Sequence, residues 1–255
     1  MKISIQQFLA FIVFVILSGI SPALAFFKLN PISRVFEPAG AGATQSYQII
    51  NDSAEQIAVE LSMVKRKISL EGEETTEKAD DDFLVFPSQI ILPPQGVQSV
   101  RVTWLGNPNP EKELAYRLVA EQLPINLKKP EPSAPETTSG GIKMMFRYMG
   151  SVYIRPKNVQ SKVVLNDITH EKGKDGNDLL VITFDNQGTR RAVLSELNLN
   201  LTSEKGSQIN LKSEELQGVN NGVILAGNQR RFSIPWPKQL PVGKVTGTFT
   251  FKDVE

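Results

Sequence analysis

Residues 83–106 read FLVFPSQIILPPQGVQSVRVTWLG, a series of short apolar runs divided by turn-forming residues. The runs are rich in Val, Ile, Phe and Trp, which favour strands, and each has the length of a strand. Pro87-Ser88, the PPQG at residues 93–96 and the GNP at residues 106–108 separate them, and such clusters favour turns. Short strands with this punctuation predict an antiparallel β-sandwich.

The same pattern extends toward the N-terminus and past the quoted stretch. Strand-like runs cover residues 26–38, 46–53, 57–68 and 113–125, and no long segment has a strong helical period. In the run at 57–68, alternation places Val59, Leu61 and Met63 on one face and Ala58, Glu60 and Ser62 on the other. The acidic segment EGEETTEKADDD, residues 71–82, is predicted to be a solvated hairpin loop.

Residues 140–158, GGIKMMFRYMGSVYIRPKN, predict one long strand that ends at Arg155-Pro156. Alternation assigns one face to Ile142, Met144, Phe146 and Tyr148, and the other to Lys143, Met145, Arg147 and Met149. The Pro/Ser/Thr/Gly tract at 127–141 predicts a mobile loop, so the strand is expected at a sheet edge. Proteins normally blunt long apolar edges because they aggregate. The strand is therefore either an ordinary core strand or an edge kept open for a partner.

After Pro156 the pattern of short strands begins again. Strand-like runs at residues 163–171, 178–188, 193–201, 221–236 and 244–254 predict a second, smaller sandwich. We therefore expect an all-β protein with one domain at residues 26–156 and another at residues 157–255.

The first 25 residues have the plan of a secretory signal peptide. Lys2 precedes an apolar run from Phe8 to Ile20, and the small-x-small triplet Ala23-Leu24-Ala25 follows. An uncleaved anchor is the alternative, but the run is shorter than the ~20 residues that a spanning helix needs. We expect export and cleavage after Ala25.

Composition argues against several classes of function. The chain has 28 Lys and Arg against 27 Asp and Glu, a balance that does not suit a nucleic-acid binder. It has no cysteine, so disulfides and thiolate chemistry are impossible, and there is no glycine-rich loop for a nucleotide. His170, the one histidine, lacks the partners for a catalytic triad or a histidine metal site. We predict no enzyme activity, cofactor or metal.

Several motifs occur in an order that resembles a known family. They are SRVF at residues 33–36, P-x-x-x-x-L-x-P-x-G-x-Q-x-V-R-V at residues 87–102, E-L-x-Y-R-L-x-x-E-x-L-P at residues 113–124, and YIRP at residues 153–156. Together they resemble the periplasmic chaperones of chaperone–usher pilus assembly, and the ELAYRL form looks like the archaic or alternate branch. The resemblance is strong over residues 31–156 and weaker beyond.

The resemblance implies two immunoglobulin-like β-sandwiches in an L or boomerang arrangement. It implies an ATP-independent periplasmic chaperone that binds, folds and caps pilus or fimbrial subunits by donor-strand complementation. Such a chaperone then delivers each subunit to the outer-membrane usher. The resemblance also leaves open self-association of the free chaperone through its donor edge. β-augmentation of this kind takes affinity from the main chain and specificity from alternate side chains.

The family's functional residues can be transferred to this sequence position by position. The donor side chains would be Ile142, Met144, Phe146 and Tyr148. The subunit's terminal carboxylate would be held by Arg34, while Ser151 stands where the best-known branch has a second cation. We expect Arg117 to replace that cation, with Arg147 as a weaker candidate. Glu113 and Arg155 match a structural ion pair.

A different exported immunoglobulin-like protein, such as a structural or adhesin subunit of a surface fibre, is the alternative. A subunit is expected to carry its own N-terminal donor extension and to lack one strand. Here the strand-like runs predict two complete sandwiches, which favours the chaperone.

Overall fold

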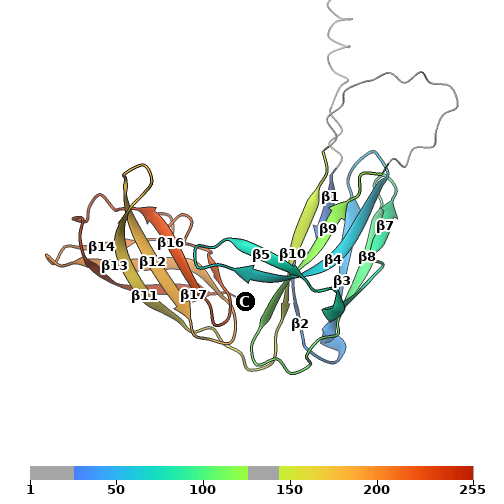
Figure 1. Ribbon diagram of the computed structural model, residues 1–255, viewed down its shortest axis with the longest axis horizontal. Helices are drawn as coiled ribbons and strands as arrows, with labels where there is room; N and C mark the ends of the chain where they lie inside the picture. The colour runs from blue at the N-terminus through green and yellow to red at the C-terminus, as the bar shows by residue number, and fades with distance from the viewer. Residues whose placement is uncertain (1–25, 126–143, 255) are drawn as a thin grey trace, which may run out of the picture.

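The computed structural model describes residues 26–125 and 144–254 (Figure 1). The predicted signal peptide at residues 1–25 and the predicted donor residue Ile142 lie outside the described residues. Within them the chain is all-β apart from two short 3-10 turns, η1 (Ala41–Ala43) and η2 (Asp80–Asp82). It folds into two immunoglobulin-like β-sandwiches, as predicted. No helix in the described ranges has the length and apolar character needed to cross a membrane.

The first domain contains two sheets. One has the order β1 (Phe27–Asn30), β3 (Thr44–Asn51), β8 (Val97–Trp104), β6 (Phe83–Phe86). The other has the order β2 (Ser33–Phe36), β10 (Arg147–Ile154), β9 (Leu114–Gln122), β4 (Ile57–Ile68), β5 (Glu74–Lys78), with β7 (Gln89–Leu92) also on β4. The predicted run at 26–38 is thus two strands, because the chain crosses from one sheet to the other at Pro31.

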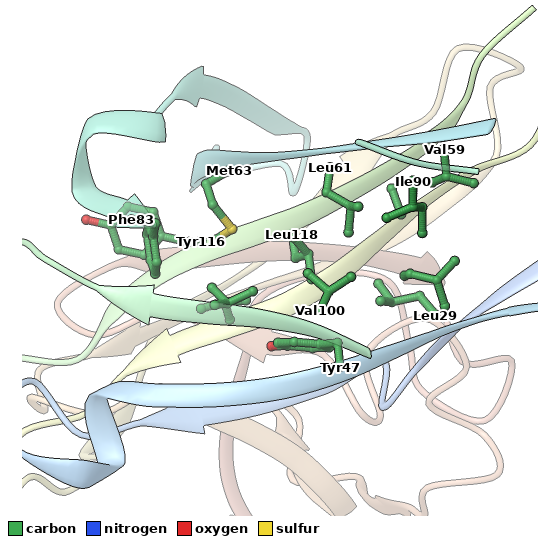
Figure 2. Packing of buried hydrophobic residues seen from close by; sticks show 14 of the residues in the cluster. Leu29, Tyr47, Val59, Leu61, Met63, Phe83, Ile90, Val100, Tyr116 and Leu118 are labelled. Atoms are coloured by element: carbon green, nitrogen blue, oxygen red, sulfur yellow. The ribbon is translucent and has the colours of Figure 1, made fainter. Parts of the chain in front are cut away.

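The core of the first domain lies between these sheets (Figure 2). The predicted alternation in β4 is confirmed, since Val59, Leu61 and Met63 are buried and point inward. At one end, Phe83 packs edge-on against Trp104 and Tyr116, each with 5.0 Å between ring centroids. Edge-to-face pairs of this kind add to the burial of their area.

The prediction of a loop at residues 71–82 is wrong for residues 74–78. Residues 74–78 form β5, which pairs antiparallel with the basic end of β4. Lys65 lies opposite Glu77, and Lys67 binds the Glu77 carboxylate at 2.5 Å. Opposite charges on facing strands stabilise the pairing even though every residue of β5 is exposed.

The second domain also has two sheets. One has the order β11 (Val163–Lys172), β12 (Asp178–Asn186), β16 (Gln229–Pro235). The other joins β13 (Ala192–Ser203) to β14 (Gln208–Leu211), β15 (Val223–Ile224) and β17 (Val245–Asp253). The boundary predicted at Pro156 falls between β10 and β11. His170 has a structural contact, since its Nε2 lies 2.5 Å from Asp178 Oδ1.

The two domains meet at an angle and touch at two places (Figure 1). At the bend, the N–H of Glu113 donates to the carbonyl of Thr189. Farther out, the β4–β5 hairpin reaches the edge of the second domain, where the N–H of Arg231 donates to the carbonyl of Leu70 at 2.7 Å. The hairpin therefore links the domains across the outer face of the six-stranded sheet.

Candidate partner-binding edge and domain junction

One side of β10 is only partly paired. Its other side pairs with β9 over the whole strand, from Arg147 opposite Glu121 to Ile154 opposite Leu114. The short strand β2 covers only residues 151–154, beginning where Ser151 lies opposite Ser33. Residues 147–150 of β10, with residues 144–146 leading into them, therefore form a free edge, in the sense that no strand in the described part of the chain pairs with them on this side.

The hydrogen-bond pattern shows which backbone groups point outward along this free edge. Phe146 uses its carbonyl to accept from Gln122 on β9, whereas the N–H of Ser151 donates to Ile32 on the β2 side. Residues in a strand alternate between the two sides. The N–H and carbonyl groups of Met145, Arg147 and Met149 consequently face away from β9 and toward the free edge.

The strand begins later than the sequence predicts. β10 starts at Arg147, and residues 144–146 carry no strand pairing apart from the bond that Phe146 accepts from Gln122. Continuing the register would place Met144 opposite Pro124, which has no N–H to donate. The ladder with β9 therefore ends near Gln122.

The predicted donor side chains have different surroundings. Met144 is 56% exposed. Phe146 and Tyr148 are half-buried and pack against the core of their own domain, and the Tyr148 ring lies 4.9 Å from that of Phe27. As a donor side chain, Phe146 was expected to face a partner and not its own core. That expectation needs correction, because Phe146 packs against the core of its own domain.

Arg117 projects from the opposite, outer face of the sheet. Its Nε and Nη2 donate to the two oxygens of Glu74 at 2.7 and 2.6 Å, and its Nη1 donates to Ser151 Oγ at 2.5 Å. Arg66 donates through Nε to the same Glu74 carboxylate at 2.8 Å. A bidentate arginine–carboxylate pair is among the strongest polar contacts in proteins.

These contacts fix the charge states of the pair. Burial opposes ionisation of Glu74, but the hydrogen bond from Arg117 and the charge of Arg66 hold its pKa below the ordinary value. The hydrogen bond that Arg117 donates to Glu74 likewise raises the pKa of Arg117. Glu74 is therefore a full negative charge at neutral pH.

The outer face bearing Arg66, Arg117, Ser151 and Tyr153, here called the junction face, is turned toward the second domain. Arg66 donates to the Tyr153 hydroxyl at 3.0 Å, and the guanidinium of Arg191, from the second domain, stacks 3.7 Å from the Tyr153 ring centroid.

Arg230, also from the second domain, lies against Gly72 in the hairpin. Burial and the nearby charge of Arg66 both lower its pKa. A cation of the second domain therefore lies near Arg66, which itself binds Glu74.

Arg34, the other predicted anchor, lies on the opposite face of the sheet. It pairs across the strands with the buried Val152, whereas Arg117 pairs with Ser151, and paired residues share a face. Its guanidinium lies 5.9 Å from the Tyr47 ring and donates to Gln45 Oε1 at 3.3 Å. No acidic side chain in the described residues forms an ion pair with Arg34. The structure thus does not bring the two predicted anchor arginines together.

The predicted Glu113–Arg155 ion pair is present, with Arg155 Nε 2.6 Å from Glu113 Oε2. Sequence reasoning missed its third member. Arg191 Nη1 lies 3.1 Å from the same oxygen, and the N–H of Arg191 donates to the other oxygen at 3.2 Å. The Glu113 side chain is 2% exposed. This trio joins the domains at the bend.

Arg147, the weaker anchor candidate, lies in an exposed ion pair with Glu121 at 3.4 Å.

Sequence reasoning also missed Arg66 and Glu74. The signal available for them was the basic VKRKI at residues 64–68 followed by the acidic EETTEK at 73–78, a charge pattern that suits facing strands. Within the described residues, no cluster of three or more His, Asp or Glu side chains could hold a metal.

Comparison with protein families identifies the chain. Residues 32–160 match the model described as "Pili and flagellar-assembly chaperone, PapD N-terminal domain". The chain belongs to this family. The matched range contains β2 to β10, hence the free edge and the junction face, and the predicted family is confirmed. No curated protein sequence matches this pilus-assembly chaperone.

Solved structures of low sequence identity share the fold of this chaperone. A chain in the CsuC–CsuE chaperone–tip adhesion subunit complex of Acinetobacter baumannii is 18% identical, with a TM-score of 0.56, covering 88% of this chain and 92% of that one. The class 5 fimbriae chaperone CfaA is 18% identical, with a TM-score of 0.51, and the match covers 90% and 100%. A chain in the Salmonella enterica SafA pilin–SafB chaperone complex is 16% identical, with a TM-score of 0.52, and the match covers 84% and 86%.

Proposed function

We propose that this chain is a periplasmic, ATP-independent chaperone that captures pilus or fimbrial subunits by adding its β10 edge to them. It would hold each subunit folded and deliver it to the outer-membrane usher. Family membership supports the chaperone role. The free edge of β10, where the backbone groups of Met145, Arg147 and Met149 point outward, is the observation that carries the binding mode.

The position of β2 sets where an added strand must end. A strand lying along residues 144–150 meets β2 at Ser33 and Ser151, and cannot continue. If the strand runs parallel to β10, its C-terminal carboxylate arrives beside Ser151, whose Oγ already contacts Arg117. We infer that the junction face is the anchor for this carboxylate, with Arg117 and Arg66 as its donors.

Arg34 is proposed as a third cation at the same strand end, on the opposite face of the sheet. A terminus at Ser33 lies in the plane of the sheet, between Arg117 on one face and Arg34 on the other. Arg34 is half-buried, its Nε is buried without a hydrogen-bond partner, and it has no acidic partner in the described ranges. A charge brought into such a site needs a cation nearby.

The test of the proposal is co-expression of the chain with the small secreted proteins encoded beside it, followed by affinity purification from the periplasm. A stable complex with one of these proteins supports subunit capture. Recovery of the chain alone, with the secreted proteins folded and free, would reject it.

Arg117→Ala should weaken capture about tenfold, since charge-assisted hydrogen bonds contribute roughly 1.5–3 kcal/mol. Arg34→Ala should have a smaller effect, because Arg117 and Arg66 both remain on the other face. Affinities of purified variants for one subunit provide the measurement, and Arg147→Ala, which removes an exposed arginine, is the control. Equal capture by Arg117→Ala and the control would remove Arg117 from the anchor.

Met144→Ser should weaken capture about tenfold, because a captured subunit would bury this exposed side chain. It should leave the free energy of unfolding unchanged within roughly 0.5 kcal/mol, because Met144 is exposed in the free chain. Phe146→Ser should weaken capture and also destabilise the free chain by about 1–3 kcal/mol, because it removes part of its own core. Chemical denaturation measures the difference. Equal destabilisation by both variants would show that Met144 belongs to the core.

A further inference from the structure

The carboxylate of Glu74 fills the site in which an incoming carboxylate would bind. Both of its oxygens are held by Arg117, and one is shared with Arg66. This is the geometry in which a guanidinium recognises a free carboxylate. A ligand of the same chemistry can reach Arg117 in that way only after Glu74 has moved.

Glu74 is held in a way that allows it to move. It lies on β5, where every residue taken as a whole is exposed. The Glu74 side chain alone, which the arginines partly cover, is still 26% exposed. The hairpin tip is fixed separately, through Leu70 and Arg231. Rotation of the Glu74 side chain toward solvent therefore releases the guanidiniums without unpairing β5 from β4 or separating the domains.

The surroundings also favour an additional negative charge. Arg66 and Arg117 share the single carboxylate of Glu74, while burial and the nearby charge of Arg66 lower the pKa of Arg230. Glu71, near the hairpin tip, pairs loosely with Arg231 at 3.8 Å. When Glu74 rotates away, Arg66 and Arg117 lose their counter-charge and attract an anion more strongly than before.

We propose that Glu74 is an internal competitor that occupies the carboxylate site of Arg66 and Arg117 until the terminal carboxylate of a bound chain displaces it. The proposal rests on the function proposed above and adds its regulation. The empty chaperone keeps its cations neutralised, so free small anions are excluded. A strand already held along β10 presents its terminus at high local concentration and displaces Glu74.

The size of the effect follows from the fraction of time that the site is open. Apparent affinity is reduced in proportion to the open fraction. If Glu74 fills the site about 90% of the time, its removal strengthens carboxylate binding about tenfold. Glu74→Gln removes the charge and keeps the shape of the side chain.

Acetate is a suitable probe, because it is a bare carboxylate that needs no β10 contact. The mature chain is titrated with sodium acetate at constant ionic strength, and the Nε–Hε signal of Arg117, assigned through Arg117→Lys, is followed by NMR. Glu74→Gln is expected to bind acetate about tenfold more tightly than the wild type. Acetamide should not shift the signal in either protein.

Glu77→Gln is the matched control. It makes the same change on the same strand, but Glu77 contacts Lys67 and not Arg117. It should titrate like the wild type. Equal acetate affinity in Glu74→Gln, Glu77→Gln and wild type would overturn the inference, as would equal tightening by both variants, which would reflect net charge alone.

The acetate result is independent of subunit capture. If the wild type captures a subunit and Glu74→Gln does not tighten acetate binding, only the role of Glu74 falls. If no secreted protein is captured at all, the proposed function fails whatever acetate does.

Discussion

Replacing Arg147 by proline is expected to weaken subunit capture by about 100-fold or more, although the Arg147 side chain makes only an exposed ion pair. The reason lies in the backbone. The N–H of Arg147 points to the free edge of β10, midway along residues 144–150. Proline removes that donor and puts its ring where an added strand would lie, while the bonds to β9 are kept. A buried carbonyl left without its donor costs about 1–3 kcal/mol, before the steric clash is counted.

The matched control is Arg147→Ala, which removes the same side chain and keeps the N–H. It should capture a subunit about as well as the wild type, because exposed ion pairs contribute roughly 0–1 kcal/mol. Titration calorimetry with one purified subunit compares the two, and circular dichroism of the free proteins checks that β10 persists. Equal capture by the proline and alanine variants would show that the β10 backbone is not the binding element.

The fold could be predicted because apolar alternation and turn residues carry most of it. Val59, Leu61 and Met63 revealed the buried face of β4, and turn clusters marked the ends of β7 and β8. β5 was missed for a physical reason. It has no apolar residue to alternate, and its pairing depends on charges in the preceding strand. A search for apolar periodicity does not detect a strand of this kind.

The site was predicted in part. The outward edge at β10 follows from its apolar run beside a Pro- and Gly-rich tract, but its extent depends on where β2 starts and β9 ends. The placement of Arg34 and Arg117 on opposite faces was readable from the sequence. Arg34 lies two residues before the buried Phe36, and Arg117 lies between the buried Tyr116 and Leu118. Alternation applied to these two strands assigns Arg34 to the inner face and Arg117 to the outer one.

The contacts across the bend could not be predicted in this way. Glu113 and Arg155 were expected to pair, yet the addition of Arg191 depends on how the second domain docks. Nothing near Arg191 in the sequence distinguishes it from the adjacent Arg190. Which of two neighbouring arginines meets a buried carboxylate is decided by the register of β13 and by the path of the preceding turn.

Glu113→Gln is expected to lower the free energy of unfolding by about 3–5 kcal/mol, the usual cost of removing one partner from a buried ion pair. The Glu113 side chain is 2% exposed, and the side chains of Arg155 and Arg191 are 16% and 9% exposed. Glutamine keeps the shape but leaves two largely buried guanidiniums without a counter-charge. Because Arg191 belongs to the second domain, the loss should also loosen the bend and separate the unfolding of the two domains.

Differential scanning calorimetry measures both effects at once. The control is Glu121→Gln, which removes an exposed partner of Arg147 and should change stability by less than about 1 kcal/mol. If Glu113→Gln unfolds at the same temperature as that control, the trio does not stabilise the junction. In that case the domains are held by the backbone bond from Glu113 to Thr189 and by the hairpin contact of Leu70 with Arg231. Subunit capture by Glu113→Gln tests the bend separately from stability. If the bend loosens, Arg230 moves away from the junction face, whereas the free edge of β10 remains intact.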